Sequence, residues 1–346
     1  MDIQKIYEEG FNPDEEYLGK DKGVNQIEPL VSVCTATYQH VKYIEDCIEG
    51  ILMQKTEFPI EIIIGEDEST DGTREICKKY AEKYPDKIRL FLRDRDTSCV
   101  FDENGKRIFG FNGKWARKSA RGKYIALCEG DDHWTDPQKL QKQVKFMKEN
   151  EDYIGCFTNY RMVNEKGEVL LSKTRPDDHI PYYDRLSMLE GGVPQTCTVM
   201  YKNLPEVFDQ VAKVVNVVNG DQVLAAFMAQ EGKIKFLKDV TADRRVGSGT
   251  FSTLHKSKQK LAGIKTFTVL KKYFKKPEEL ECLNRRINKL YIELILTSVK
   301  NFNINNVIIY ERERLAKTGL PFNNKISTIV SFIVKGITFR IKRNAK

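Results

Sequence analysis

One short stretch restricts the possible folds of this chain more than any other. The apolar run at residues 124–128 stops abruptly in three carboxylates, Glu129, Asp131 and Asp132, arranged around Gly130. A short continuous apolar run is typical of a strand that is buried on both faces of a largely parallel sheet. Ligands of such sheets bind beyond the carboxyl ends of the strands. Because clustered carboxylates repel one another, they are most easily tolerated around a hard cation such as Mg2+ or Mn2+. The stretch therefore predicts a metal and phosphate site at one edge of an α/β sheet.

A second interpretation of the same residues requires no ligand. Asp131 and Asp132 would then form a solvated turn before a helix that begins near residues 135–137. In that helix Asp136 would act as the cap, and Pro137 would take the first helical position, which suits proline.

The residues before the acidic stretch alternate between strand and helix patterns. Apolar runs predict strands at residues 31–35, 60–64 and 88–92, and helical spacing predicts helices over 44–52 and 76–84 and a basic helix over 113–121. Such alternation predicts parallel βαβ units. No Gly-x-Gly-x-x-Gly or Gly-Lys-Ser/Thr loop follows the first strand, which argues against dinucleotide-binding dehydrogenases and P-loop hydrolases. Phosphate must then be held by a metal ion and basic side chains.

Composition indicates one catalytic domain with an extension. The chain has 346 residues, of which 40% are hydrophobic and 31% charged, so it can bury a large core. Its eight cysteines show no Cys-x-x-Cys spacing and favour a reducing compartment over disulfides or zinc. The organisation expected is an acidic extension at residues 1–28, a catalytic domain at 29–254 and a helical region at 255–346.

The charge of +8 is divided unevenly. Residues 255–346 contain 21 Lys and Arg against 6 Asp and Glu, whereas residues 1–254 contain 36 against 43. The helical end, at 323–346, combines an apolar stripe with basic residues and is too interrupted to cross a bilayer. It predicts a cytoplasmic protein held on the inner face of the membrane by anionic lipid, whereas packing on the catalytic domain is the alternative. No nucleic-acid partner is expected.

Three groups of residues resemble one known family. They are Val31-Ser32-Val33 with Thr37-Tyr38, the stretch 62–73 around Asp67, and the stretch 122–137 around Gly130. In order and spacing they are similar to family 2 glycosyltransferases over residues 29–160, and more weakly to about 253. The resemblance implies a GT-A fold, which is a Rossmann-like, mixed and mostly parallel sheet flanked by helices. It also implies a nucleotide-sugar donor, usually a UDP-sugar, a divalent metal and inversion at the anomeric carbon.

The resemblance assigns roles residue by residue. Thr35, Thr37 and Tyr38 would border the nucleotide base, and Asp67 would accept a hydrogen bond from the uracil N–H. The metal would be held by Asp131, Asp132 and Glu129, of which Glu129 and Asp131 would also contact the nucleotide-sugar. Glu129 replaces the commoner Asp, so its longer side chain could reach ribose or a metal-bound water instead. Lys114, Arg117 and Lys118 are weaker candidates for binding the donor, because charged helical faces are usually solvated.

The second half of the chain supplies the remaining chemistry. Asp221 lies where the family has an acid pair that contributes the catalytic base, with Gly220 where an acid is common; the alternative is that Asp221 caps a helix. Arg245 lies in a basic, glycine-rich stretch that resembles a loop closing over the donor diphosphate, and its planar donor fork suits phosphate. The family often has His where Gly247 stands.

These residues predict an inverting glycosyltransferase of surface polysaccharide biosynthesis with a glycan or lipid-linked acceptor. A sugar-phosphate nucleotidyltransferase is one alternative, although the loop at 36–39 lacks the Gly-rich, Arg-containing pattern expected of it. A non-catalytic nucleotide-sugar-binding module is the other, favoured by Gly220 and Gly247. Donor sugar, acceptor, linkage and oligomeric state depend on variable loops and are not predicted.

Overall fold

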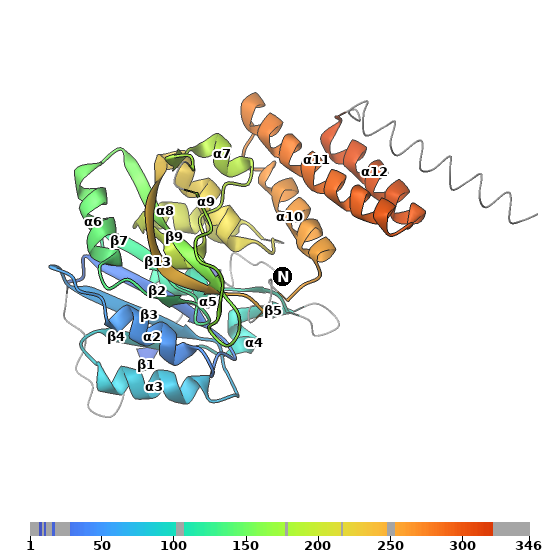
Figure 1. Cartoon of the computed structure of the whole chain (residues 1–346). Coiled ribbons are helices and arrows are strands. Elements are labelled where there is room, and N and C mark those ends of the chain that lie inside the picture. Colours follow the sequence, from blue (N-terminus) through green and yellow to red (C-terminus); the bar gives the residue numbers. More distant parts are fainter. Residues whose placement is uncertain are drawn as a thin grey trace, which may run out of the picture. The chain divides into compact units, whose positions relative to one another are not determined.

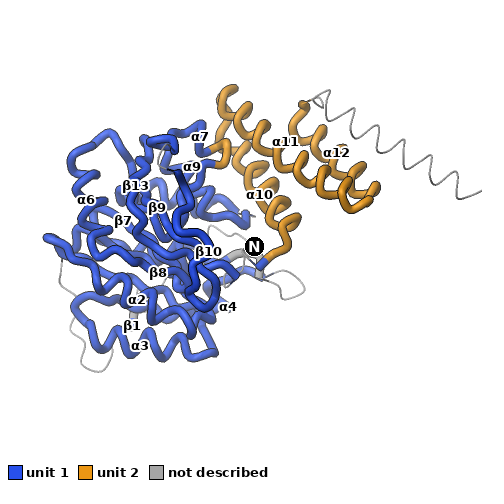
Figure 2. Tube along the Cα trace, viewed as in Figure 1, with its two compact units in different colours: residues 1–188, 192–253 blue, residues 189–191, 254–346 orange. Residues whose placement is uncertain are grey.

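A computed structural model describes residues 7–8, 10–11, 16–17, 28–101, 107–176, 179–215, 217–247 and 253–320. The chain forms two compact units: residues 1–188 with 192–253, and residues 189–191 with 254–346 (Figure 2). Each unit is described by itself below.

The first unit is built on one large mixed sheet. In spatial order its strands are β1 (Glu16–Tyr17), β4 (Ile88–Leu92), β3 (Ile60–Glu66), β2 (Val31–Thr37), β7 (Tyr124–Leu127), β12 (Val199–Lys202), β9 (Tyr153–Val163), β13 (Lys233–Arg245) and β11 (Tyr182–Tyr183). The run β4-β3-β2-β7 is parallel, and β12 is antiparallel to both β7 and β9. β9 and β13 are again parallel. The predicted mixed α/β sheet flanked by helices, with further helices at the carboxyl end, is confirmed.

Helices cover the sheet because its strands are apolar on both faces. Alternate residues of β2, β3 and β4 join a core with α2 (Ile44–Leu52), α3 (Thr73–Lys83) and α6 (Lys139–Glu149). Figure 1 shows α2 and α3 next to each other. α5 (Asn112–Lys118) contacts β2, β3 and α8 (Pro205–Lys213), and α8 contacts α9 (Gly220–Glu231). The helices predicted at residues 44–52, 76–84 and 113–121 therefore form, with ends shifted by a few residues.

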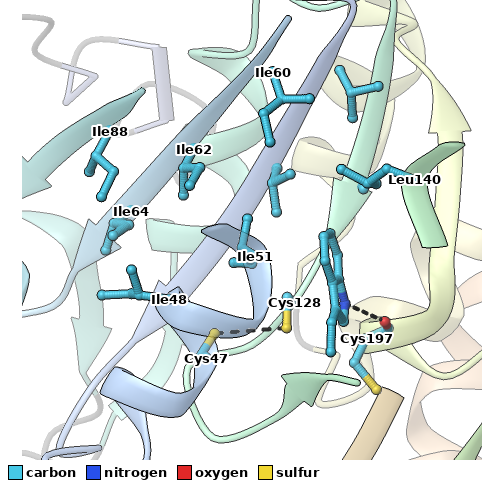
Figure 3. Close-up of a cluster of buried hydrophobic side chains, with 14 of the residues drawn as sticks. Cys47, Ile48, Ile51, Ile60, Ile62, Ile64, Ile88, Cys128, Leu140 and Cys197 are labelled. Carbon is cyan, nitrogen blue, oxygen red and sulfur yellow. Dashed lines mark hydrogen bonds between the residues drawn. The ribbon is translucent and has the colours of Figure 1, made fainter. Parts of the chain in front are cut away.

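The core extends directly beneath the acidic stretch. Trp134, in the short strand β8 (His133–Trp134), is fully buried and donates from Nε1 to the carbonyl of Cys197 over 2.8 Å (Figure 3). Cys47 and Cys128 approach each other to 3.8 Å between sulfurs. All eight cysteines are buried free thiols. The acids thus follow a strand whose surroundings are closely packed.

Two local expectations have other outcomes. α6 begins at Lys139, with Gln138 as its N-cap, and not at Pro137. Asp136 instead accepts from the Gln138 N–H, so it closes the turn that precedes the helix. β5 (Cys99–Phe101) and β6 (Arg107–Gly110) pair antiparallel, and the Asn104-Gly105 pair between them, which is typical of a hairpin turn, lies outside the described residues.

The second unit is helical throughout its described part. It contains α10 (Lys256–Leu270), α11 (Pro277–Lys300) and α12 (Ile304–Thr318), and α11 contacts both of the others. α11 begins at Pro277, and α12 ends before Gly319, whose φ of 65° is the left-handed value that glycine accepts most easily. In the part of the chain that the structure describes, no helix is both long and apolar enough to cross a membrane. The amphipathic stretch at 323–346 lies outside the described residues.

Candidate active site

The acidic loop between β7 and β8 is fixed on the end of β2. Gly130 donates from its N–H to the carbonyl of Ala36 over 3.1 Å. A Cβ at Gly130 would lie 2.5 Å from Oγ1 of Thr37 and 2.8 Å from Nδ1 of His40. Only glycine allows the loop to lie this close to β2. Thr37, which is expected to border the nucleotide base, is 2% exposed and lies next to Gly130 of the acidic loop.

Asp132 is held by Arg245, the last residue of β13. Its Oδ1 accepts the backbone N–H of Arg245 over 2.8 Å, and Nε of Arg245 donates to the carbonyl of Asp131 over 3.1 Å. Burial, and then repulsion from Asp131, raise the pKa of Asp132 to about 8. Burial and the neighbouring carboxylate thus disfavour the charged form of Asp132, a cost that a bound cation would offset. The expected role of Asp132 as a metal ligand remains a prediction.

Arg245 is already engaged by protein groups. Besides Asp131, its guanidinium contacts Oδ2 of Asp46 at 3.2 Å and the carbonyl of Glu165 at 3.5 Å, and it lies 4.5 Å from the centroid of the Tyr43 ring. Its expected role in binding diphosphate would require these donors to be released. That role remains a prediction, and the contacts support a structural role instead.

The neighbouring Arg244 has the electrostatic environment expected of a site residue. Successive side chains of a strand point to opposite faces, so Arg244 and Arg245 of β13 diverge. Burial raises the pKa values of both Asp132 and Asp221, and the positive charge of Arg244 opposes that rise. Arg244 was not predicted as a site residue, and the alternation of β13 was the available signal.

Asp221 and Glu129 interact electrostatically. Burial, then repulsion from Asp131 and from Asp221, raise the pKa of Glu129 to about 7, against the opposing charge of Arg117. Burial also raises the pKa of Asp221. Both residues remain exposed to solvent, although protein atoms surround their carboxyl groups closely enough to produce these shifts. The fold thus brings a carboxylate from the start of α9 close to the acidic loop after β7.

Asp221 does not cap α9. The N-cap is Asn219, which makes no side-chain capping bond, and Oδ1 of Asp221 accepts the N–H of the next residue, Gln222, over 2.8 Å. A capping carboxylate would instead accept an N–H two or three residues further on. The helix-cap interpretation of Asp221 therefore has no support in this geometry.

A second arginine, Arg117, which the sequence offers only as a weaker candidate, lies within electrostatic range of Glu129. Arg117 is partly buried on α5, and its Nε has no hydrogen-bond partner among the described residues. Burial lowers its pKa, while the negative charge of Glu129 opposes that shift. A buried guanidinium with an unpaired donor is costly and is suited to an anionic ligand. By contrast, Nζ of Lys118 lies 4.8 Å from the ring centroid of Tyr7. The expected role of Lys118 in donor binding remains a prediction.

The nucleotide end of the site contains a third arginine. Arg95, in the short helix α4 (Arg95–Ser98), donates to Oδ2 of Asp67 over 2.8 Å and lies 3.8 Å from the centroid of the Tyr38 ring. Ser98 donates to Oδ1 of Asp67 over 2.9 Å. Tyr38 and Asp67, predicted to meet a base, thus lie close to the same guanidinium. Thr35 is fully buried inside β2, and its hydroxyl has no partner among the described residues.

The acids fit a divalent cation by their chemistry. Carboxylate oxygens are the ligands that Mg2+ and Mn2+ prefer, and Mg2+ commonly takes only one or two of them together with substrate phosphates. Glu129 and Asp131 supply such oxygens next to each other, and their mutual repulsion is the cost that a cation would remove. Within the described ranges, no group of three or more His, Cys, Asp or Glu is arranged as a complete metal site. Phosphate and water oxygens would have to complete the coordination.

Comparison with known proteins gives one family. Residues 32–100 match the model "Glycosyl transferase family 2". A Mycobacterium tuberculosis protein is 33% identical over 234 residues, covering 66% of this chain and 63% of the relative. The Bacillus subtilis protein TuaG, whose name refers to teichuronic acid biosynthesis, is 33% identical over 158 residues, covering 46% of this chain and 57% of TuaG. This chain therefore spans about three fifths of the length of these relatives.

Two solved structures share the fold at 16% identity. One is Staphylococcus aureus TarS in complex with UDP-GlcNAc, with a TM-score of 0.51 over 85% of this chain and 93% of that one. The other is the mannosyltransferase PcManGT of Pyrobaculum calidifontis in complex with GDP-Man and Mn2+, with a TM-score of 0.53 over 99% and 90%. At this identity the likeness concerns the fold alone.

Proposed function

Because this chain belongs to glycosyltransferase family 2, we propose that it is an inverting glycosyltransferase. It transfers a sugar from a nucleotide-sugar, of which a UDP-sugar is the first choice, to a hydroxyl group of a glycan or lipid-linked acceptor. The observation that supports this most is the electrostatic interaction between Asp221 and Glu129, since the charge of Asp221, after burial and the charge of Asp131, contributes to the raised pKa of Glu129. Asp221 would then lie within electrostatic range of the loop expected to hold the diphosphate.

The proposed reaction is a direct displacement. Asp221 takes the proton of the acceptor hydroxyl as its oxygen attacks the anomeric carbon. The bond between that carbon and the phosphate oxygen breaks on the opposite face, and the nucleoside diphosphate leaves with the bonding electron pair. Arg117 and Arg244, which act on Glu129 and Asp221, supply positive charge near the departing diphosphate.

Asp131 and Glu129 would hold the divalent cation, with Asp132 fixing the loop through Arg245. When bound, the cation supplies charge neutralisation for the diphosphate. At the other end, Asp67 would receive the base N–H, with Tyr38 and Arg95 packing on the base. Arg95 must then shift partly from Asp67 when the nucleotide binds.

A donor-hydrolysis screen tests this function. Purified protein is incubated with Mn2+ and a set of UDP- and GDP-sugars, and release of UDP or GDP is measured. Slow hydrolysis of one donor, lost in Asp221→Asn, is the expected result. Formation of a nucleotide-sugar and pyrophosphate from a nucleoside triphosphate and a sugar phosphate would instead identify a nucleotidyltransferase. Binding of a donor without hydrolysis, even with a broad set of acceptors, would identify a non-catalytic module.

The biological setting is also part of the proposal. The name of TuaG supports a role in surface polysaccharide assembly, in which acceptors are commonly attached to lipid. A cytoplasmic enzyme bound to the inner membrane face would meet such an acceptor. The net charge of residues 255–346 supports this location.

A further inference from the structure

Helix α12 presents its apolar residues away from the unit to which it belongs. Its fully buried residues are Val307, Arg314 and Thr318, of which one is aliphatic, while Ile304 is half-buried. Arg314 is fixed there by Glu311 and by Oδ1 of Asn288, at 2.6 Å. A surface helix of a globular protein normally shows the reverse arrangement, with its apolar stripe toward the core.

The outward face of α12 is a continuous stripe. Ile308, Ile309 and Leu315 are 51%, 49% and 45% exposed. The exposed residues follow helical spacing of three and four: Asn305, Ile308, Ile309, Arg312, Leu315, Ala316. Phe302, in the turn before α12, is 75% exposed, the largest value among the exposed large hydrophobic residues of the described chain. This outward stripe contains no carboxylate and one arginine. Figure 1 shows α12 beside α11, at the margin of the second unit.

The charge of the unit indicates what covers this stripe. Described residues 254–320 contain 15 Lys and Arg against 6 Asp and Glu, a net charge of +9. A second copy of the chain would bring the same positive charge against this face. Residues 321–346 contain six further Lys and Arg and no acid, which adds to the positive charge of this region of the chain. An anionic bilayer surface is the occupant that satisfies both the apolar stripe and the charge.

We propose that the outward stripe of α12, together with Phe302, is a membrane-docking surface that inserts among anionic lipid headgroups. Ile308, Ile309 and Leu315 would enter the boundary between headgroups and acyl chains, and Arg312 would contact lipid phosphate. The proposal concerns described residues and does not require the stretch at 323–346. It also does not depend on the proposed transferase activity, which is measured separately below.

Vesicle binding by the full-length protein tests this surface. The vesicles contain either phosphatidylcholine alone or an equimolar mixture of phosphatidylcholine and phosphatidylglycerol. The variant Ile308→Ser/Ile309→Ser/Leu315→Ser removes the stripe. The matched control, Val169→Ser/Leu170→Ser/Leu171→Ser, removes three equally exposed apolar residues from β10 (Val169–Leu171). Because only exposed side chains change, both variants are expected to fold, which thermal melts would show.

The expected result is salt-sensitive binding to the anionic vesicles only, weakened roughly tenfold or more in the α12 variant and unchanged in the control. Phe302→Trp should also give a blue-shifted emission on binding, against a constant background from the buried Trp115 and Trp134. Equal binding by the wild type and the α12 variant would overturn the proposal and place the attachment elsewhere. The proposal would also be overturned if the wild type did not bind the vesicles at all. Self-association of the wild type that is lost in the α12 variant would overturn it as well. Donor hydrolysis without vesicles should be the same in all these proteins, so failure of the transferase proposal would be recognised independently.

Discussion

The backbone N–H of Arg245 donates to Oδ1 of Asp132 over 2.8 Å and so joins the end of β13 to the acidic loop after β7. The Arg245 side chain continues from this bond to the carbonyl of Asp131 and to Asp46 on α2. One residue therefore connects three elements that are distant in sequence. The position of the acids depends on this arginine as well as on the strand that precedes them.

Arg245→Ala should lower the free energy of unfolding by about 1 to 3 kcal/mol, because the carbonyl of the buried Asp131 loses its donor, whereas the bond from the backbone N–H to Asp132 is retained. Urea unfolding followed by circular dichroism measures this. Lys142→Ala is the control, since Lys142 pairs with Asp136 and Asp239 on the surface, where such pairs contribute about 1 kcal/mol or less. Unchanged stability of Arg245→Ala together with a loss of UDP affinity would restore the phosphate-binding role expected from the sequence.

UDP binding should require a divalent cation and the acidic loop. Without a cation, the diphosphate faces carboxylates of its own sign around Gly130. Titration calorimetry with UDP should show strong binding only with Mn2+ or Mg2+, and little binding by Asp131→Ala. Asp239→Ala removes an exposed carboxylate elsewhere and should bind normally. Undiminished affinity in the metal-free protein or in Asp131→Ala would remove the proposed metal site.

The sequence was sufficient for the parallel run β4-β3-β2-β7, because these strands are short apolar runs that end in polar loops. The run at 124–128 and the acids after it lie where the pattern predicted. Asp67 and Tyr38 both contact Arg95, and their roles at a nucleotide base remain predictions. Local patterns fail where the outcome depends on packing between distant elements. Arg117 belongs to a basic helix that looks solvated by sequence, and only its packing shows the buried, unpaired Nε.

The adjacent arginines of β13 illustrate the same limit. Family resemblance pointed to Arg245, and nothing in the sequence indicated that Asp46 and the carbonyl of Asp131 occupy its donors. The alternation of a strand requires that one of two successive side chains faces each way. Which one faces the acids depends on the register of β13 against β9 and β8, and that register follows from contacts that no local pattern encodes.

Asp221→Asn should reduce sugar transfer by a factor of roughly 100 or more while UDP affinity and stability are retained. Asparagine keeps the size of the side chain but cannot accept the proton. Asp184→Asn provides the matched control, because Asp184 accepts the N–H of Ser187 at the start of α7 (Arg185–Leu189) and has a structural role. Near-normal turnover by Asp221→Asn would show that another group acts as the base.

Arg244→Gln should move the acidic limb of the pH–rate profile toward higher pH. Burial raises the pKa of Asp221, and the positive charge of Arg244 opposes that rise. Without this charge the pKa of Asp221 rises further. A general base acts only when it is deprotonated, so the transfer rate falls as pH drops through this pKa, and the variant should lose activity at a higher pH than the wild type. Well above the pKa, the position of the limb no longer affects the rate, and any remaining difference reports the contribution of Arg244 to binding the diphosphate.

Arg244→Lys retains the charge and should leave the limb close to its wild-type position. Values of kcat/KM measured across pH for the wild type, Arg244→Gln and Arg244→Lys test this prediction. An acidic limb at the same pH in Arg244→Gln and the wild type would show that Arg244 does not act on the base.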